Sequence, residues 1–435
     1  MNTNRRIAIK RLWIIPLMML FGAAAQAQEP VGDWQGTLKT GAAELRVIVH
    51  IEKENDGSWK ARLFSIDQGS DGIPATSTTV KGSTVKLMFE AIHGTYEGKI
   101  SADGSSMSGT WTQGQPFALD LKRATKETAW QRDPASHKVL LIAVENEVKL
   151  EVLDWGGSGR PIILLTGLGN NAHIFDKFAP KLTSTYHVYG ITRRGYGASS
   201  APASGYSADR LGDDVLAVID SLQLRRPVLV GHSIAGEELS SVGSRHPEKV
   251  AGLIYLDAGY SYAYYDRSRG DLNIDLLDLQ KKLDQLQPGK GPQDPRQLIA
   301  ELLETSLPGF ERDLRAMRKD LESAPRASPA QPPPAMPAAA QAIMAGQQKY
   351  TDIRVPILAI YALPHDLGPQ FKEDAAARAA AEALDIAKTG AQAKAFETGL
   401  PSARVVRLPR ANHYVFLSNE ADVLREMNAF IGSLP

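Results

Sequence analysis

At residues 226–236 the chain reads Arg-Pro-Val-Leu-Val-Gly-His-Ser-Ile-Ala-Gly, a short apolar run followed directly by a turn. Residues 228–230 are apolar and mostly β-branched, as expected of a strand that is buried on both faces. From residue 237 to residue 246 the pattern becomes helical, and a proline follows it. The sequence therefore places Ser233 at a strand-to-helix turn.

The turn around Ser233 has the pattern of a nucleophile elbow, in which a serine stands between small residues. Gly231 and Ala235 lie two positions before and two positions after it, where bulky side chains would collide with the neighbouring strand or helix. The serine Oγ then stands clear of the sheet, and the N–H of Ile234 lies at the start of the helix, where it favours negative charge. Because a pattern this short arises by chance in roughly one chain in three of this length, the surrounding elements must support it.

With this elbow between a buried strand and a helix, the chain resembles the α/β-hydrolase superfamily over about residues 138–435. The resemblance implies an α/β fold with a mostly parallel sheet and a helical lid insertion at about residues 258–350. It also implies that the catalytic residues follow the chain order Ser, Asp, His.

The composition agrees with a globular chain of more than one domain. Its 435 residues suggest two or more domains, and 49 basic residues balance 49 acidic ones. This balance gives no reason to expect nucleic acid or another polyanion as a partner. The chain has no cysteine, which excludes disulfides, a thiol nucleophile and thiolate metal sites.

Residues 1–27 have the pattern of a secretory signal peptide. Arg5, Arg6, Lys10 and Arg11 precede an apolar stretch, and Ala25-Gln26-Ala27 forms a small-x-small cleavage site. The alternative is an uncleaved membrane anchor, but the apolar stretch is short for a membrane span. We therefore expect a periplasmic or secreted protein with no membrane span after cleavage, exported by the Sec or the twin-arginine route.

Residues 28–123 are expected to form an all-β sandwich or barrel. Short alternating runs are separated by turn signals every 8–12 residues. Trp34 and Trp111 lie in similar segments near the start and end of this unit, and each could close one end of a small barrel. The unit resembles the small β domains that precede some exported bacterial hydrolases, and that resemblance assigns it no activity. Residues 124–137 are polar and are interpreted as a linker.

A serine nucleophile needs a base and an orienting carboxylate. His413 follows the last predicted strand, where the α/β-hydrolase resemblance implies the catalytic histidine. Two aspartates are candidates for the acid: Asp366 follows the penultimate strand, and Asp257 follows the strand before it. The resemblance favours Asp366, with Asp257 as the alternative. His365 is interpreted as a supporting or exposed residue.

The resemblance also implies a second oxyanion donor beside Ile234. Residues 161–166 predict a buried strand that ends in Gly167-Leu168-Gly169, and in the superfamily the corresponding loop supplies a backbone N–H. Here Thr166-Gly167 replaces the usual His-Gly pair, so the donor would be the N–H of Leu168. The substitution leaves this donor intact because it is a backbone group.

The segment after Asp257 differs from the sheet pattern and lies where the superfamily inserts a lid. Tyr260 and Tyr262 follow the strand closely and are candidates for lining a substrate pocket. Such an insertion shapes the pocket and excludes water.

Together these features predict a serine hydrolase that cleaves a carboxylic ester or a similar acyl bond through an acyl-serine. Amidase, lactonase and perhydrolase activity on the same fold remain alternatives, as does a non-catalytic binding protein. A small-molecule acyl substrate is the expected partner. No cofactor or metal is expected, because the sequence contains no HExxH or comparable cluster.

Overall fold

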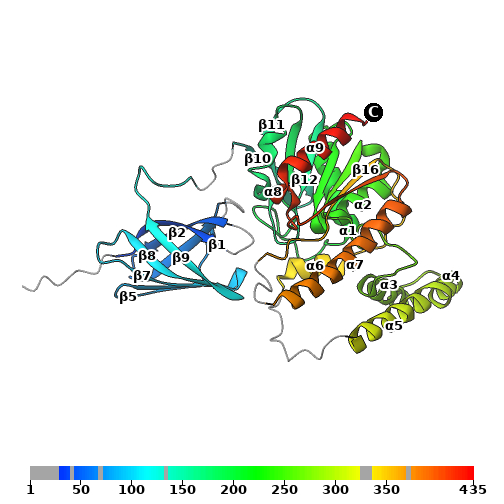
Figure 1. Cartoon of the computed structure of the whole chain (residues 1–435), viewed down its shortest axis with the longest axis horizontal. Coiled ribbons are helices and arrows are strands. Elements are labelled where there is room, and N and C mark those ends of the chain that lie inside the picture. The colour runs from blue at the N-terminus through cyan, green and yellow to red at the C-terminus, as the bar shows by residue number, and fades with distance from the viewer. Residues whose placement is uncertain (1–28, 40–43, 67–71, 132–135, 324–335, 369–373) are drawn as a thin grey trace, which may run out of the picture.

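The computed structural model describes residues 29–39, 44–66, 72–131, 136–323, 336–368 and 374–435 (Figure 1). The predicted signal peptide at residues 1–27 lies outside the described residues. Two sheets organise the chain, one before and one after the segment predicted as a linker.

The first sheet is a nine-stranded antiparallel half-barrel. Its strands are β1 (Gly32–Lys39), β2 (Glu44–Lys53), β3 (Trp59–Ser65), β4 (Ile73–Pro74), β5 (Ser77–Lys81), β6 (Thr84–Phe89), β7 (Gly94–Ile100), β8 (Ser106–Gln113) and β9 (Gln115–Arg123). Their order is β4-β3-β2-β1-β9-β8-β7-β6-β5, so most neighbours in space are also neighbours along the chain. Alternate residues of β6 and β7 face inward, as a two-residue period requires.

The two tryptophans lie toward opposite ends of this half-barrel, as the sequence predicted. Trp34 pairs with Arg123 at the end of β9, and Trp111 pairs with Phe117 near its start. Both rings are buried in one apolar core. The indole N–H of Trp34 donates to the Pro30 carbonyl at 2.7 Å, so its polar atom is satisfied at that end.

The second sheet has eight strands and carries the elbow. Its strands are β10 (Lys138–Glu145), β11 (Val148–Gly156), β12 (Pro161–Leu165), β13 (His187–Ile191), β14 (Val228–His232), β15 (Gly252–Leu256), β16 (Ile357–Ala362) and β17 (Ala403–Leu408). In the order β10-β11-β13-β12-β14-β15-β16-β17, the β10–β11 and β11–β13 pairs are antiparallel and the other pairs are parallel. This is the α/β-hydrolase fold that the sequence predicted.

Nine helices lie in the described part of the α/β domain, and five of them cover the two faces of the second sheet. They are α1 (Ala208–Ser221), α2 (Gly236–Arg245), α3 (Leu272–Gln285), α4 (Arg296–Glu301), α5 (Leu307–Ser323), α6 (Ala338–Ala345), α7 (Ala375–Gly399), α8 (Val415–Ser418) and α9 (Glu420–Gly432). One core joins the sheet to α1, α2 and α7, and the other joins it to α8 and α9. The central strands are therefore buried on both sides, as their continuous apolar runs predicted.

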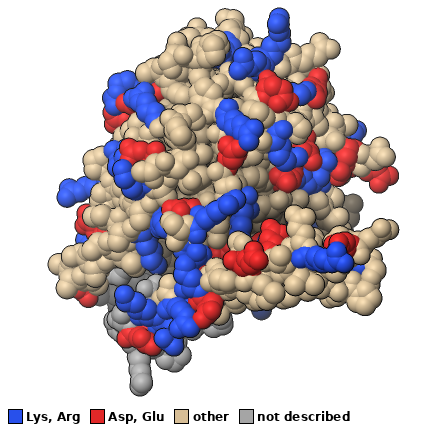
Figure 2. Space-filling model, turned by 90° about the vertical axis from the view of Figure 1, so that its right-hand side faces the viewer, with Lys and Arg blue, Asp and Glu red and all other residues tan. Residues whose placement is uncertain are grey.

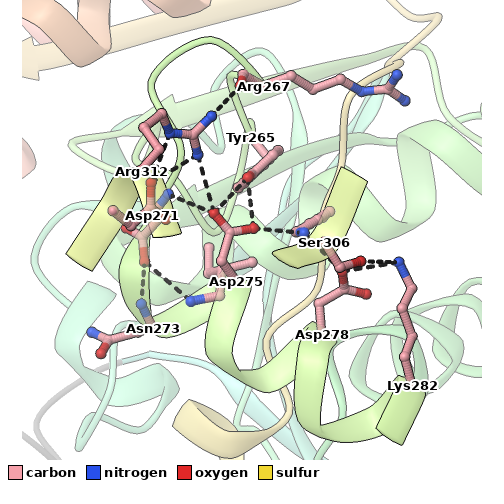
Figure 3. A network of polar contacts seen from close by, with 12 residues as sticks. Tyr265, Arg267, Asp271, Asn273, Asp275, Asp278, Lys282, Ser306 and Arg312 are labelled. Atoms are coloured by element: carbon pink, nitrogen blue, oxygen red, sulfur yellow. Dashed lines mark hydrogen bonds and ion pairs between the residues drawn. The ribbon is translucent and has the colours of Figure 1, made fainter. Parts of the chain in front are cut away.

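Helices α3 to α6 lie between β15 and β16, where the sequence predicted an insertion. Figure 3 shows the polar contacts that hold α3 in place. The Asp275 carboxylate accepts hydrogen bonds from the Tyr265 hydroxyl at 2.7 and 2.8 Å and lies 3.3 Å from Arg312 of α5. Asp271 caps the N-terminus of α3 by accepting from the backbone N–H of Asn273. These contacts hold α3 to α5 and to the segment that follows β15.

The surface carries mixed charge. On the face of the α/β domain that lies opposite the β domain, basic side chains are interspersed with acidic ones (Figure 2). Within the described residues, no helix has both the length and the hydropathy needed to cross a bilayer.

Candidate active site

Ser233 stands at a strained turn between β14 and α2. Its φ of 53° is in the left-handed region, which a non-glycine residue adopts at a cost. A Cβ on Gly231 would lie 2.9 Å from Leu239 Cδ1 and 3.1 Å from the Ala235 Cβ. The small residues therefore allow strand and helix to approach closely enough to form the turn, which is the elbow geometry that the sequence predicted.

His413 lies beside this serine, in the loop between β17 and α8. Its Nε2 is 2.9 Å from the Ser233 Oγ, and its Nδ1 is 2.6 Å from the Asp257 Oδ2. The imidazole thus connects a hydroxyl on one side to a carboxylate on the other. With its Nδ1–H donated to Asp257, the histidine presents an unprotonated Nε2 that can accept the hydroxyl proton.

The structure brings Asp257 to His413, and not Asp366, which the sequence favoured. Asp366 is exposed, and its Oδ1 accepts a hydrogen bond from the Gly368 backbone N–H at 2.9 Å. The backbone N–H of Asp366 donates to the Ala411 carbonyl at 2.8 Å. This bond fixes the loop, and the Asp366 carboxylate stays in a turn at the surface. The alternative acid, Asp257, is therefore the one whose position suits the role.

Asp257 is fully buried at the end of β15 and is held from several sides. Its Oδ1 accepts hydrogen bonds from the Ala362 backbone N–H at 3.1 Å and from the Tyr260 hydroxyl at 3.0 Å. Burial alone would raise the pKa of Asp257, but hydrogen bonds from His365 and His413 lower it to about 2. The carboxyl group of Asp257 is therefore ionised near neutral pH.

Tyr260 was predicted to line a substrate pocket, and the structure gives its hydroxyl a different contact. The hydroxyl donates to Asp257, and burial raises the pKa of this phenol. Tyr262 lies closer to the reacting centre. It packs against the cluster that contains Leu168 and Ile234. Burial raises the pKa of the Tyr262 phenol well above its ordinary value, and a hydrogen bond with the Ser233 side chain lowers it in part. Its role in substrate binding stays a prediction.

A second histidine contacts the same carboxylate oxygen. His365 Nε2 lies 2.8 Å from Asp257 Oδ2, and His365 Nδ1 lies 2.9 Å from Asp385 Oδ1 of α7. Burial opposes protonation of His365, but its hydrogen bonds and charge interactions with Asp257 and Asp385 raise its pKa to about 9. A protonated His365 would donate to both carboxylates and so hold Asp257 in place.

This arrangement predicts a pH-dependent contribution of His365 to stability. Its pKa is raised in the folded chain from 6.5 to about 9, so the contribution is fully present below pH 6.5 and is lost as the pH rises through about 9. We expect His365→Gln to lower the free energy of unfolding most at pH 6, with the deficit shrinking toward pH 9.5. Urea denaturation at several pH values measures this difference.

The control for this prediction is His246→Gln, which changes a partly exposed histidine at the end of α2. His173, whose pKa is also raised, is retained in both variants and cancels from the comparison with the wild type. A deficit for His365→Gln that stays constant from pH 6 to pH 9.5 would show that His365 is not charged in the folded chain.

The loop expected to supply the second oxyanion donor lies directly against the elbow. A Cβ on Gly167 would lie 3.2 Å from the Ser233 Cβ and 2.8 Å from His232 Nδ1, so only glycine permits this approach. The side chains of Leu168 and Ile234 pack in one cluster. The backbone segments of both expected donors therefore lie together at the serine.

Arg193 links this loop to the elbow helix. It is buried, and it donates through Nη2 to the Thr166 carbonyl at 2.8 Å and through Nε to Glu238 of α2 at 2.5 Å. Sequence reasoning missed this residue, because its partners are 27 and 45 positions away along the chain. One guanidinium thus fixes the loop and the helix relative to each other.

Two groups of side chains in the described residues have the spacing to hold a metal ion. One is Asp257, His365 and His413, whose atoms are engaged in the hydrogen bonds just described. The other is His137, His173 and Asp176, in which both histidines lie close to the Asp176 carboxylate, at 3.2 and 3.1 Å. The sequence predicted no metal because it contains no HExxH or comparable cluster, and the first and last residues of each group are far apart along the chain.

The chain is similar to known hydrolases in sequence and in fold. Residues 162–426 match the model of the Alpha/beta hydrolase family. Over 119 residues the chain is 40% identical to the AB hydrolase superfamily protein YisY of Bacillus subtilis, covering 27% of this chain and 44% of that one. Over 101 residues it is 27% identical to the 2-(acetamidomethylene)succinate hydrolase of Mesorhizobium japonicum, covering 23% and 36%. The matched part thus spans less than half the length of these curated relatives.

Among solved structures, the chain is similar to a thermophilic esterase from Thermogutta terrifontis. The sequences are 19% identical, the match covers 68% of this chain and 98% of the esterase, and the TM-score is 0.42. The family match covers the sheet from β12 onward, together with Ser233, Asp257 and His413. The chain therefore belongs to the Alpha/beta hydrolase family.

Proposed function

We propose that this protein is a serine hydrolase that cleaves a carboxylic ester through an acyl-serine intermediate. The observation that carries the proposal is the continuous hydrogen-bonded row of Ser233, His413 and Asp257 at the elbow. A binding protein has no need of this alignment, which is the arrangement that activates a hydroxyl.

In the first half of the reaction, Ser233 Oγ attacks the ester carbonyl while His413 Nε2 takes its proton. Asp257 stabilises the imidazolium that forms. The backbone N–H groups of Ile234 and Leu168 are the donors for the oxyanion of the tetrahedral intermediate. The intermediate collapses when His413 gives its proton to the leaving alcohol, which leaves an acyl-Ser233.

In the second half, water attacks the acyl carbon, and His413 takes a proton from that water. The second tetrahedral intermediate then collapses and releases the carboxylic acid, while His413 returns the proton to Ser233 Oγ. The scheme depends on the serine at the elbow, because its hydroxyl forms the acyl-enzyme and is set free again when water hydrolyses that ester.

The proposal is tested by the pre-steady-state hydrolysis of 4-nitrophenyl acetate. We expect a burst of nitrophenol that approaches one equivalent per protein if deacylation is slower than acylation, and Ser233→Ala should abolish both burst and turnover. Ser244→Ala, on the same helix but away from the elbow, is the matched control and should retain activity. Turnover that persists in Ser233→Ala would contradict the proposal. Preferential cleavage of an anilide or a lactone would show that the substrate is an amide or a lactone instead of an open-chain ester.

We also propose that the protein acts in the periplasm or outside the cell. The support is the basic front, apolar stretch and small-x-small site within residues 1–27. N-terminal sequencing of the expressed protein should find Gln28 as the first residue, and an intact Met1 on a membrane-bound chain would contradict cleavage.

A further inference from the structure

The β domain contributes to a cavity that its sequence did not predict. A cavity of about 550 Å³ lies at one end of the half-barrel, and side chains such as Leu38, Val47, Leu63 and Leu119 form its inner wall. Trp111 lines it as well, so the cavity is at the end away from Trp34. Its volume is within the range of about 300–1,000 Å³ that is usual for small-molecule sites.

The α/β domain forms the remaining wall. Gly169, Asn170 and Asn171 come from the loop after β12, and Tyr196 and Gly197 come from the loop after β13. In Figure 1 the β domain lies beside the α/β domain. The cavity is therefore shared between the two sheets, which the sequence presents as separate units.

The loop residues connect this cavity to the proposed active site. Gly169 to Asn171 directly follow Leu168, the expected oxyanion donor. The Asn170 Oδ1 accepts a hydrogen bond from the Tyr414 hydroxyl at 3.2 Å, and the Tyr414 ring lies 5.7 Å from that of His413. One end of the cavity thus lies within one or two residues of the groups that would surround the reacting carbonyl.

The lining restricts what the cavity can bind. Within the described residues, its wall contains aliphatic and aromatic side chains and a few amides and hydroxyls, but no charged side chain. A charged ligand would lose its hydration there without gaining an ion pair, whereas an aliphatic chain would be removed from water. Closed barrels of about eight strands have interiors wide enough to hold one small ligand, and here the α/β domain covers the end of the half-barrel that contains the cavity.

We propose that this cavity binds an uncharged aliphatic chain of the ester substrate, so that the β domain forms part of the substrate site. The inference rests on the proposed esterase function and makes it specific for esters with a long apolar chain. The chain belongs either to the acyl group or to the alcohol, and both present the same surface to the cavity. The carbonyl would then lie at the oxyanion loop, with the chain passing Asn170 and Tyr196 toward Trp111.

The first test measures binding without catalysis. The full-length Ser233→Ala chain is titrated with N-phenyl-1-naphthylamine, a neutral apolar probe whose fluorescence rises in apolar surroundings. Leu45→Trp replaces a half-buried leucine of the cavity wall by the bulkier indole ring, which takes up space in the cavity. Met88→Trp is the matched control, because Met88 is 40% exposed on β6 and does not line this cavity. We expect Leu45→Trp to weaken binding about tenfold, as the loss of one or two buried methylenes would, and Met88→Trp to leave it unchanged.

The second test uses chain length as the variable in the active protein. For nitrophenyl esters of increasing acyl length, kcat/KM should rise on the order of threefold for each added methylene until the cavity is filled. Acetate esters of increasing alcohol length form a second series, and the series with the steeper rise identifies which part of the ester enters. Leu45→Trp should flatten that rise, whereas Met88→Trp should leave it unchanged.

If Leu45→Trp does not fold, as judged by circular dichroism, Ala91→Trp at the exposed rim replaces it. Equal probe binding in Leu45→Trp and Met88→Trp, or rates that do not depend on chain length in either series, would overturn the proposal while leaving esterase activity intact. Loss of probe binding in Leu45→Trp in a protein that hydrolyses no ester would support the cavity and contradict the proposed function.

Discussion

Asp257→Asn is expected to lower kcat by about 10⁴-fold, a loss typical of removing the orienting carboxylate from such a triad. Asn keeps the shape of the side chain and tolerates the left-handed backbone at this position, where φ is 47°. Its amide group, however, would donate to His413 Nδ1 and so force the proton onto Nε2. The imidazole would then face Ser233 with an N–H and could not accept the hydroxyl proton. Steady-state hydrolysis of a nitrophenyl ester measures the loss.

Asp366→Asn is the matched control, because it makes the same chemical change in the carboxylate that the sequence favoured. Asp366 is exposed and bonds within its own turn, so this variant should retain wild-type activity within about twofold. If Asp366→Asn proves the more damaging of the two, Asp257 is not the acid that orients His413.

Arg193→Ala is expected to cost about 3–5 kcal/mol of folding stability, the usual penalty for removing one partner of a buried ion pair. The change would leave Glu238 buried without its cation, next to Glu237, whose pKa burial already raises well above the ordinary value. It would also free the Thr166 carbonyl and loosen the loop that carries Leu168. We therefore expect lower activity as well as a lower midpoint in urea denaturation.

Two further variants separate the effects of stability and position. Arg225→Ala removes an exposed arginine and should change the free energy of unfolding by less than about 0.5 kcal/mol. Arg193→Met combined with Glu238→Leu replaces the ion pair by apolar side chains, which should restore much of the stability but not the activity. Recovery of full activity in the double variant would show that Arg193 does not hold the oxyanion loop in position.

The sequence was sufficient to predict those features of the fold and the site that depend on residues close together along the chain. The apolar run before Ser233 and the small residues around it predicted the elbow, because strand, turn and helix follow one another within a few positions. His413 was placed by its position after the last strand. The choice between Asp257 and Asp366 could not be made in this way, since both follow parallel strands at the same edge of the sheet. It depended on how the loop after β16 bonds to Ala411, which is a tertiary contact.

Other features had no signal in the sequence. Asp385 lies in an alanine-rich helix with nothing to mark it, yet α7 brings it to His365. Arg193 belongs to a turn that the resemblance treats as structural, and its contacts are visible only in the folded chain. The cavity could not be predicted at all, because its walls come from two sheets whose relative position no local pattern encodes.

The most direct test of the central claim, that Ser233 is activated for acyl transfer, is labelling with a fluorophosphonate followed by mass spectrometry of the peptides. We predict one phosphonate per chain on Ser233, no labelling of Ser233→Ala, and much slower labelling of Asp257→Asn. A folded wild-type protein that remains unlabelled, or that carries its label on a different serine, would contradict the claim.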